Sequence, residues 1–364
     1  MSSIVLLGST GSIGVNTLLI AQRYNIDVEA LVAGKNIDLL NKQIEKYNPK
    51  FVAIADEKDR DRVNHNRVFI GENGILELLE ESKSDTVVNA LVGYIGLSPT
   101  LKSISLGKKV ALANKESLVV AGEFIDIDKI VPIDSEHFGL WYLMNGRAFS
   151  KLYITASGGA FRDWDISDMK SATFAEALNH PNWSMGNKIT IDSATMTNKL
   201  FELLEAKWLF DTTNIDAFIE KKSIIHALVE FVDGSTTAHF AGVDMKLPIA
   251  FALKERIDDN ILPPVDLIKM GSIEFKPITS ERYPIWEIKE HILENPHLGV
   301  VVNASNEEAI KKFEKGECNF FEMSKIVLES YKKFDNIRAK NIDEIIQIDK
   351  EVREYAKSIS KKSR

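Results

Sequence analysis

Residues 4–14 read Ile4-Val5-Leu6-Leu7-Gly8-Ser9-Thr10-Gly11-Ser12-Ile13-Gly14. The four apolar residues have the length of a buried strand, and a helical pattern that includes Leu18 and Leu19 follows the glycines. Glycines allow the backbone to approach a pyrophosphate at the N-terminus of a helix. The glycine spacing is G-x-x-G-x-x-G, whereas the common fingerprint is G-x-G-x-x-G. We therefore predict that a Rossmann-like, dinucleotide-binding domain begins here.

Apolar runs continue to alternate with helical patterns over the next hundred residues. They lie at residues 28–32, 51–55, 86–90 and 109–112, and a loop with glycine or small residues follows each of them. This alternation is typical of an α/β protein with a parallel sheet that is covered on both faces. Ligands of such sheets bind beyond the carboxyl ends of the strands, so we expect functional side chains in these loops.

The loop after the second predicted strand indicates which dinucleotide is bound. Gly34, Lys35 and Asn36 stand where an NAD-specific site carries an acidic residue for the ribose 2′-hydroxyl. Lys35 and Asn36 suit a 2′-phosphate instead, so the sequence favours NADPH over NADH. The alternative is that Lys35 is an ordinary surface lysine after a turn.

Three polar residues follow the predicted strand at residues 109–112. They are Asn114, Lys115 and Glu116, and their position at a strand end predicts that they face the ligand crevice. A helix start explains the same residues differently, with Asn114 as its cap and Lys115 in solvent. Both interpretations remain open.

Two carboxylates follow the last apolar run of this alternating region. If the strand continues, Asp134 and Glu136 project to the same side, because side chains alternate along a strand. Two such carboxylates repel each other unless a cation or a proton lies between them, and hard oxygen ligands suit Mg²⁺ or Mn²⁺. With Glu202 as a third ligand, the set would leave positions for water and substrate. The alternative is that Asp134 or Ser135 caps the next helix.

Residues 180–202 read His-Pro-Asn-Trp-Ser-Met-Gly-Asn-Lys-Ile-Thr-Ile-Asp-Ser-Ala-Thr-Met-Thr-Asn-Lys-Leu-Phe-Glu. The first seven residues have no period, which indicates an ordered loop that carries Trp183 and Met185 as an apolar flap. Residues 188–191 alternate, so we predict a short strand there. Asp192 and Ser193 then stand where a helix N-cap belongs.

The predicted helix places polar groups near its N-terminus, where free backbone N–H groups favour an anion. Asn198, Lys199 and Glu202 lie within one turn of one another, and Asn198 and Glu202 share a face. On this stretch alone, a capped amphipathic helix after a turn is an equally good interpretation.

The pattern changes near residue 150. Residues 151–155 predict a strand, and residues 156–160 (Ala-Ser-Gly-Gly-Ala) predict a small-residue loop that can wrap a phosphate. Residues 223–232 and 235–240 flank Asp-Gly and predict a β-hairpin. Alternating exposed strands of this kind often pair with a second subunit, so we expect a homodimer.

These patterns divide the chain into consecutive segments. We predict an NADPH-binding domain over residues 1–150, a central α/β catalytic and dimerisation domain over 151–260, a linker over 261–284 and a C-terminal helical domain over 285–364.

Composition excludes several classes of protein. With 45 basic and 53 acidic residues, the formal charge is −8, which argues against a nucleic-acid partner. Cys318 is the only cysteine, so an internal disulfide is excluded and a reducing compartment is expected. The first strand begins near residue 4 and no apolar run has the length of a membrane span, so we expect a cytoplasmic protein without a membrane partner.

Six motifs together resemble one known family. They are residues 8–14, 112–118, 132–137, 157–159, 180–186 and 192–202, and in this order they resemble the 1-deoxy-D-xylulose 5-phosphate reductoisomerase family. The resemblance covers the first two predicted domains, and the helical C-terminal part matches in character alone. Residues 220–223 (Glu-Lys-Lys-Ser) depart from the usual His-Pro-Gln-Ser of the family, which we interpret as a structural difference.

The resemblance implies specific residue roles. The divalent cation, Mg²⁺ or Mn²⁺, would be held by Asp134, Glu136 and Glu202, and these residues with Lys199 would form the catalytic set. The substrate would be bound by Lys115, Ser135, Glu136, Ser157, His180, Ser193, Asn198, Lys199 and Glu202. NADPH would be bound by Thr10, Gly11, Ser12, Ile13, Gly34, Lys35, Asn36, Asn114, Glu116 and Gly186. Trp183 and Met185 would belong to a lid that closes over the substrate.

The implied reaction is the rearrangement and NADPH-dependent reduction of 1-deoxy-D-xylulose 5-phosphate to 2-C-methyl-D-erythritol 4-phosphate, in the non-mevalonate isoprenoid precursor pathway. The residues alone indicate a metal-dependent, NADPH-linked enzyme that acts on a small phosphorylated molecule. Two alternatives remain: an NADPH dehydrogenase without isomerase activity, which leaves the three carboxylates unused, and a non-catalytic nucleotide sensor, which gives no reason for a phosphate site or a lid.

Overall fold

The computed structural model describes residues 3–254 and 256–359. The chain forms two compact units, each assembled from separate segments. The first unit comprises Met1–Ser117, Ile125–Ser135 and Asp244–Pro263, and the second comprises Leu118–Phe124, Glu136–Val243 and Pro264–Arg364. The boundaries at residues 150, 260 and 284 do not coincide with these divisions and stay a prediction. Residues 360–364 of the predicted helical domain lie outside the described ranges. Every helix in the described ranges is too short or too polar to cross a lipid bilayer.

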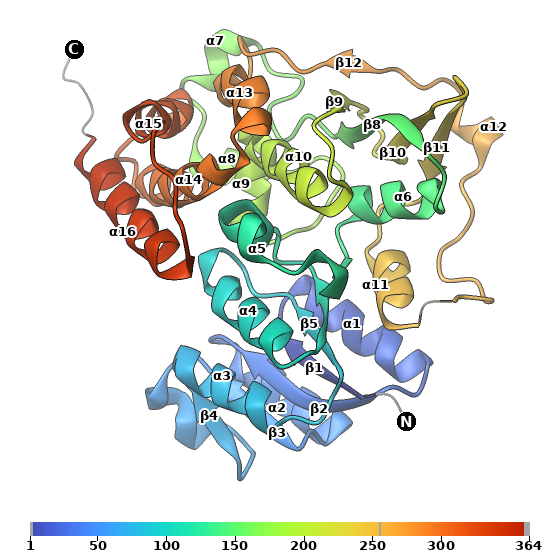
Figure 1. Cartoon of the computed structure of the whole chain (residues 1–364), viewed down its shortest axis with the longest axis vertical. Helices are drawn as coiled ribbons and strands as arrows, with labels where there is room; N and C mark the ends of the chain where they lie inside the picture. Colours follow the sequence, from blue (N-terminus) through green and yellow to red (C-terminus); the bar gives the residue numbers. More distant parts are fainter. Residues whose placement is uncertain (1–2, 255, 360–364) are drawn as a thin grey trace. The chain divides into compact units, whose positions relative to one another are not determined.

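The first unit is built on a parallel sheet of seven strands in the order β4-β3-β2-β1-β5-β6-β7 (Figure 1). The strands are β1 (Ser3–Leu7), β2 (Asp27–Ala33), β3 (Phe51–Ile54), β4 (Val68–Ile70), β5 (Thr86–Asn89), β6 (Lys109–Leu112) and β7 (Ile130–Pro132). Neighbouring strands are parallel throughout this sheet. The strand order reverses between β1 and β5, and ligands of such sheets bind beyond the carboxyl ends of the strands at this point. The predicted α/β fold class is confirmed.

Helices α1 (Ser12–Arg23), α2 (Ile37–Tyr47), α3 (Gly71–Glu81) and α4 (Leu97–Ser105) connect these strands, with short 3₁₀ turns at Glu57–Arg62, Tyr94–Gly96 and Ile127–Lys129. Helix α11 (Lys246–Leu253) belongs to the same unit but follows strand β11 (Thr236–Phe240) in the chain. Helix α5 (Lys115–Ala121) begins in the first unit and ends in the second, where the 3₁₀ turn Gly122–Phe124 follows it.

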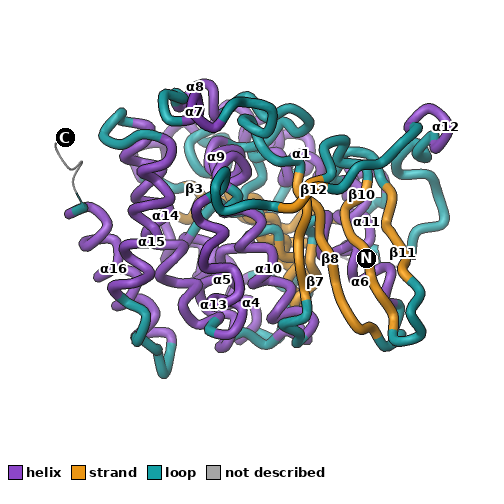
Figure 2. Tube along the Cα trace, turned by 90° about the horizontal axis from the view of Figure 1, so that it is seen from above, coloured by secondary structure: helices purple, strands orange, loops and turns teal. Residues whose placement is uncertain are grey.

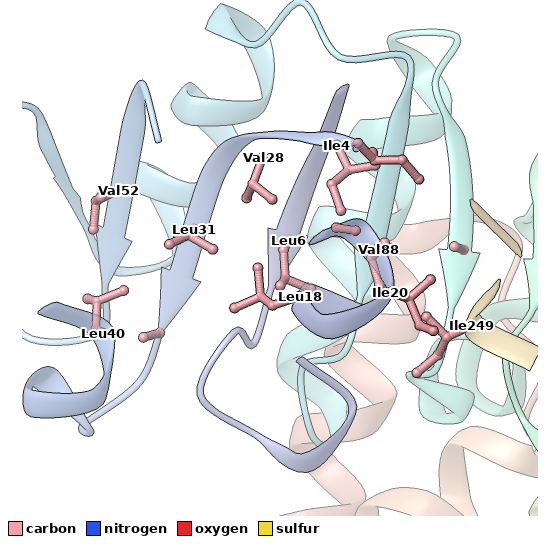
Figure 3. Packing of buried hydrophobic residues seen from close by; sticks show 14 of the residues in the cluster. Ile4, Leu6, Leu18, Ile20, Val28, Leu31, Leu40, Val52, Val88 and Ile249 are labelled. Carbon is pink, nitrogen blue, oxygen red and sulfur yellow. The ribbon is translucent and has the colours of Figure 1, made fainter. Parts of the chain in front are cut away.

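The core of the first unit explains why its strands read as continuous apolar runs. Leu6 of β1, Leu18 of α1 and Ile249 of α11 belong to one buried cluster (Figure 3). The alternate residues Val5 and Leu7 of β1 belong to a second cluster. Because β1 is buried on both faces from Ile4 to Leu7, each of these four positions is apolar. Helix α11 completes the first cluster although it lies more than a hundred residues after β7 in the sequence.

The turn after β1 requires two of its glycines, Gly8 and Gly14. Gly8 has φ +85°, and a Cβ atom there would lie 2.4 Å from the carbonyl oxygen of Ala90. A Cβ atom on Gly14 would lie 2.3 Å from the carbonyl oxygen of Gly8. The backbone N–H groups of Gly8 and Ser9 both donate to the carbonyl oxygen of Val32, which joins the turn to β2. The predicted strand, glycine turn and helix are confirmed.

The second unit contains a five-stranded mixed sheet in the order β11-β10-β8-β9-β12 (Figure 2). Its strands are β8 (Phe149–Ala156), β9 (Ile215–Ile219), β10 (Ile225–Phe231), β11 (Thr236–Phe240) and β12 (Lys276–Pro277). Strands β8 and β9 are parallel, and the other neighbours are antiparallel. The predicted hairpin is confirmed: β10 and β11 pair across the Asp-Gly turn, where Gly234 has φ +85°.

Helices make up the rest of this unit. They are α6 (Ser135–Met144), α7 (Ile166–Met169), α8 (Phe174–Ala177), α9 (Asn187–Thr195), α10 (Thr197–Phe210), α12 (Leu267–Met270), α13 (Lys289–Glu294), α14 (Gly299–Glu314), α15 (Phe320–Lys333) and α16 (Ile342–Ser358). Turns Pro284–Ile288 and Pro296–Leu298 are 3₁₀ helices. Helix α14 packs against α15 and α16 (Figure 2), so the C-terminal part of the chain is helical as predicted.

Three local predictions are wrong. The structure has helix α9 where a strand was predicted at residues 188–191, because four alternating residues are too few to distinguish the two periods. Asp192 and Ser193 are therefore interior residues of α9, not N-caps. Strand β7 ends at Pro132 and α6 begins at Ser135, so the extended backbone predicted between Asp134 and Glu136 is replaced by a helix start. Residues 261–284, whose role as a linker stays a prediction, contain α12 and strand β12 of the sheet.

Candidate active site

The glycine turn of the first unit presents the start of α1. Thr10 precedes the N-cap residue Gly11, and Ser12 and Ile13 form the first turn of the helix. Gly11 has no side chain, so the first N–H groups of α1 receive no side-chain cap from it. Unpaired N–H groups at a helix N-terminus attract an anion such as a pyrophosphate.

Gly34, Lys35 and Asn36 follow β2 and are all exposed. The Asn36 side chain accepts a hydrogen bond from the backbone N–H of Leu39 at 3.2 Å and so caps α2. Asn36 thus has a structural role, whereas the exposed position of Lys35 leaves its ammonium group accessible to an anion.

Asn114 is buried and organises the loop after β5. Its Nδ2 atom donates to the carbonyl oxygens of Leu91 and Gly93 at 2.9 and 2.8 Å and lies 3.2 Å from a carboxylate oxygen of Glu116. Its Oδ1 atom accepts the backbone N–H of Ser117 at 3.2 Å. Asn114 therefore caps the start of α5, as the helix-start interpretation predicts, and its amide ties the loop after β5 to this helix.

Lys115 and Asp134 form a nearly buried ion pair within the first unit. The Lys115 Nζ atom lies 2.7 Å from Oδ2 of Asp134, and their side chains are 7% and 13% exposed. The alternative in which Lys115 lies in solvent is wrong. Ser135, the next residue after Asp134, is buried at the start of α6.

Glu136, Lys199 and Glu202 come together in the second unit. The Lys199 Nζ atom lies 2.8 Å from Oε1 of Glu136 and also donates to the carboxylate of Glu202. The Asn198 amide donates to the other carboxylate oxygen of Glu202. Glu202 is only 2% exposed, so a carboxylate from α6 and one from α10 share a single buried ammonium group.

The two carboxylates of this cluster favour a positive charge between them. Burial favours the neutral amine of Lys199, but Glu136 and Glu202 outweigh burial and raise the pKa of Lys199 above its usual value. Two carboxylates that converge on one cation have the hard oxygen donors that a divalent metal prefers. His137 lies beside them and its Nε2–H donates to the backbone oxygen of Glu202 at 2.8 Å, which gives it a supporting role.

Ser157 and His180 meet in a second polar cluster of the same unit. The turn after β8 runs through Gly158 and Gly159, which have φ +87° and +71°. The Ser157 hydroxyl lies 2.8 Å from Nε2 of His180 and accepts the backbone N–H of Gly159 at 3.1 Å. The predicted small-residue loop thus forms a tight turn in which the serine is held by a histidine.

The hydrogen bonds of His180 fix its tautomer. Its Nδ1 atom faces the backbone N–H groups of Asn182 and Trp183 at 3.1 and 2.9 Å, so Nδ1 must be an acceptor. The proton of the neutral ring is then on Nε2 and is donated to Ser157. Burial, together with Arg162, lowers the pKa of His180 to about 4, which keeps the ring neutral near pH 7. The Ser157 oxygen accepts hydrogen bonds from His180 and from the backbone N–H of Gly159, so its own O–H group is available to donate to a third partner.

Ser193 lies on α9 next to this turn. A Cβ atom on Gly159 would lie 2.6 Å from both the backbone oxygen of Ser193 and the Cα atom of Ala194. Only glycine allows this approach, which places the predicted residues Ser157 and Ser193 on adjoining segments.

The predicted lid residues lie between this turn and α9. Trp183 is partly buried, with its ring edge-to-face against His226 at a centroid distance of 6.1 Å. Met185 is partly buried and Gly186 is the exposed N-cap of α9. A Cβ atom on Gly186 would meet nothing within 4 Å, so nothing in the described chain requires glycine there.

Sequence reasoning missed two residues of this region. Arg162 donates to the backbone oxygens of Ser157 and Lys221 at 3.0 and 2.8 Å, and the Asn182 amide donates to Lys221 O at 2.7 Å. The two bonds to Lys221 reach its backbone oxygen across dozens of residues, and no spacing pattern signals a contact of this kind.

Sequence comparisons identify relatives of the chain. The model of the 1-deoxy-D-xylulose 5-phosphate reductoisomerase family matches residues 4–122. The model of the 1-deoxy-D-xylulose 5-phosphate reductoisomerase C-terminal domain matches residues 130–210, and that of a further DXP reductoisomerase C-terminal domain matches residues 240–355. The 1-deoxy-D-xylulose 5-phosphate reductoisomerase of Nautilia profundicola is 58% identical over 362 residues, 97% of this chain and 99% of the relative. That of Campylobacter hominis is 52% identical over 355 residues, with 97% and 99% covered.

Solved structures agree with this result. A crystal structure of DOX-P reductoisomerase in complex with NADPH, fosmidomycin and magnesium is 33% identical, with a TM-score of 0.89 over 98% of this chain and 97% of that chain. The Zymomonas mobilis 1-deoxy-D-xylulose 5-phosphate reductoisomerase in complex with NADPH is 31% identical, with a TM-score of 0.87 over 98% of both chains. The resemblance found in the sequence motifs is thereby confirmed: the chain belongs to the 1-deoxy-D-xylulose 5-phosphate reductoisomerase family.

Proposed function

We propose that this protein converts 1-deoxy-D-xylulose 5-phosphate to 2-C-methyl-D-erythritol 4-phosphate, with NADPH as reductant and a divalent cation at the carboxylates. The observation that carries this proposal is the pair Glu136 and Glu202 on two helices, converging on one buried ammonium group. A dehydrogenase without isomerase activity leaves this cluster without a purpose, and family membership argues against it.

The cation would be held by Asp134, Glu136 and Glu202. Asp134 precedes Glu136 by two residues, so the two carboxylates are close through chain connectivity alone. Mg²⁺ is present in a solved relative, and the same oxygen donors suit Mn²⁺. When bound, the cation supplies Lewis acidity toward the ketone and hydroxyl oxygens of the substrate. Lys199 keeps its proton between Glu136 and Glu202, so it can donate a hydrogen bond to a substrate oxygen.

The phosphate of the substrate would be bound by Ser157, Ser193, Asn198 and His180. The Ser157 hydroxyl can donate to a phosphate oxygen because both of its observed partners are donors to it. A phosphate held away from the reacting carbons supplies binding energy that orients them. Lys115 and Ser135 would also contact the substrate.

NADPH would bind beyond the carboxyl ends of β1 and β2. The start of α1, at Thr10, Gly11, Ser12 and Ile13, would receive the pyrophosphate, and Lys35 would pair with the 2′-phosphate. Gly34 and Asn36 would line the ribose, while Asn114, Glu116 and Gly186 would complete the site. Trp183 and Met185 would close over the substrate and exclude water.

We also infer that the protein is a cytoplasmic homodimer. Strand β11 is the edge of its sheet in the described chain, and Phe240 on it, like Trp141 and Tyr142 on α6, exposes a large ring. An unpaired edge beside exposed aromatic rings is suited to pairing with a second copy. Cys318, the only cysteine of the sequence, is buried, which agrees with a reducing compartment. Light scattering on the protein and on a Phe240→Lys variant tests the dimer.

The function is tested by NADPH oxidation with 1-deoxy-D-xylulose 5-phosphate, with and without Mg²⁺, and with NADH in parallel. We expect oxidation that depends on substrate, stops with chelator and returns with Mg²⁺ or Mn²⁺. Oxidation that survives complete removal of metal would reject the carboxylate site and favour the simple dehydrogenase. NADPH binding without oxidation would favour the nucleotide sensor.

A further inference from the structure

Asp192 is a buried carboxylate that neither the metal cluster nor the predicted substrate contacts use. It lies within α9 and is 2% exposed. The Lys188 Nζ atom, one turn earlier on α9, lies 2.8 Å from its Oδ2 atom. From α14, the Asn306 amide donates to its Oδ1 atom at 2.7 Å. Asn306 is 1% exposed and lies 114 residues further along the chain, so α14 holds α9 through a buried polar contact.

The opposite side of α9 adjoins the turn that carries Ser157. Gly159 of that turn lies so close to Ser193 and Ala194 that a methyl group would not fit between them. Ser193 is the residue directly after Asp192. A rotation of α9 about its axis would therefore displace the Ser193 hydroxyl and separate the helix from the turn.

The orientation of α9 also passes to α10. Met196 alone separates the two helices, in a left-handed conformation with φ +69° and 2% exposed. A left-handed backbone conformation is unfavourable for any residue other than glycine, and it persists only where the surrounding structure holds it. Asn198 follows two residues later, so a change in α9 reaches it through a short, stiff connection.

A buried carboxylate needs hydrogen-bonding partners, and removing one partner is costly. Apolar packing tolerates small rotations of a helix, whereas the hydrogen bond from Asn306 on α14 constrains the direction in which the Asp192 carboxylate, and with it α9, can point. Lys188 lies on α9 itself and holds the other carboxylate oxygen in place. We propose that Asp192 and Asn306 are positioning residues for the phosphate end of the substrate, holding α9 so that the Ser193 hydroxyl lies beside the Ser157 turn. This inference rests on the proposed function.

The test is a reciprocal exchange. Asn306→Asp places a second carboxylate beside Asp192, and repulsion should turn α9. Adding Asp192→Asn restores one amide and one carboxylate, and the new amide can still accept from Lys188 through its oxygen. The double variant should therefore recover what the single variant loses, which a general loss of packing would not do.

Steady-state kinetics with substrate, NADPH and Mg²⁺ give the readout. For Asn306→Asp we expect KM for the substrate to rise about tenfold, as for one lost hydrogen bond to a charged group, with kcat and KM for NADPH within about twofold of the parent. Inorganic phosphate binding, measured by calorimetry, should weaken in parallel. The control is Asp349→Asn on α16, which removes a buried carboxylate bonded to Arg353 at 2.6 Å and should lower stability without changing KM.

The proposal is overturned if Asn306→Asp lowers the melting temperature but leaves substrate KM and phosphate affinity at parent values. It is also overturned if the double variant fails to recover either quantity. Absence of turnover in the parent protein would reject the proposed function instead, and phosphate calorimetry on the same three proteins would still decide whether Asp192 and Asn306 shape the anion site.

Discussion

The Nε2 atom of His180 lies 2.8 Å from the Oγ atom of Ser157, in a tautomer fixed by two backbone N–H groups on the opposite ring nitrogen. This contact depends on a neutral ring, because a protonated Nδ1 could no longer accept from Asn182 and Trp183. The segment that begins the predicted lid and the turn after β8 are therefore joined through one uncharged imidazole.

The first prediction concerns the pH dependence of stability. The pKa of His180 falls from a usual value of 6.5 to about 4 because the ring is buried and faces Arg162. A lowered histidine pKa means that the unfolded chain binds the proton more tightly. The contribution of His180 to stability is thus complete above pH 6.5 and is lost as the pH falls toward 4.

Urea unfolding of the parent protein and of His180→Gln at pH 7.5 and pH 5 measures this effect. The difference in free energy of unfolding between the two proteins should be larger at pH 7.5, since only the parent carries the titrating ring. Other histidines contribute equally to both proteins. An equal difference at the two pH values would contradict the assigned tautomer.

The second prediction concerns the metal. Glu202→Gln should weaken Mg²⁺ binding by at least about tenfold and reduce activity with it, because a carboxylate ligand becomes a neutral amide. The matched control is Glu308→Gln. Glu308 is also buried and also bonds a lysine three residues away, Lys311, at 2.7 Å. Mg²⁺ titrations measure the metal affinity of both variants. Equal affinity in the two would show that Glu202 is not a ligand of the cation.

The third prediction concerns cofactor choice. Lys35→Asp should reduce the preference for NADPH over NADH by about tenfold or more, because a carboxylate at this strand end repels a 2′-phosphate and suits a 2′-hydroxyl. Lys42→Asp makes the same charge change at an exposed position on α2 and should leave the preference unchanged. The ratio of kcat/KM for the two cofactors is the measurement. If the ratio of kcat/KM for NADPH and NADH is the same in both variants, Lys35 does not contact the cofactor.

The fourth prediction separates backbone strain from steric contact. Gly159 and Gly316 have nearly the same φ, +71° and +72°, but a Cβ atom meets the backbone of α9 at Gly159 and nothing within 4 Å at Gly316. Gly316→Ala should cost about 1 kcal/mol of stability, for left-handed backbone alone. Gly159→Ala should cost roughly 1–3 kcal/mol more, for overpacking, and should also raise substrate KM. Thermal and urea unfolding compare the two; equal losses would mean that α9 moves away freely.

Several elements could be predicted from the sequence because they depend on local chemistry. Gly8 is required by φ and by close approach and Gly14 by close approach, and Asp-Gly at residues 233–234 matches a hairpin turn. The family, the reaction and its cofactors were likewise predicted from motif order, and the comparisons confirm them. Manganese use, the residue roles, the dimer and the compartment remain predictions.

Other features depend on contacts that local sequence does not encode. Residues 188–191 alternate in polarity as a strand does, yet they and Asp192 lie in helix α9. The Asp192 carboxylate accepts a hydrogen bond from Asn306, which lies 114 residues away in the sequence. Asp134 and Glu136 read as one strand face, but Ser135 starts a helix between them. In both cases packing at a distance overrides a period that only four or fewer residues support.

The return of α11 to the first unit has a consequence for synthesis on the ribosome. Residues 244–263 complete a core begun at residue 4, and Asp259 pairs with Arg23 and Tyr24 at 2.9 and 2.6 Å. At about 5–20 residues per second, translation needs roughly ten seconds after residue 135 to supply that segment. During this interval the nascent chain exposes the apolar side of α1 while the second unit is already emerging. The first unit therefore cannot complete its core until residues 244–263 are made, by which time strands β8 to β11 of the second unit have already been synthesised.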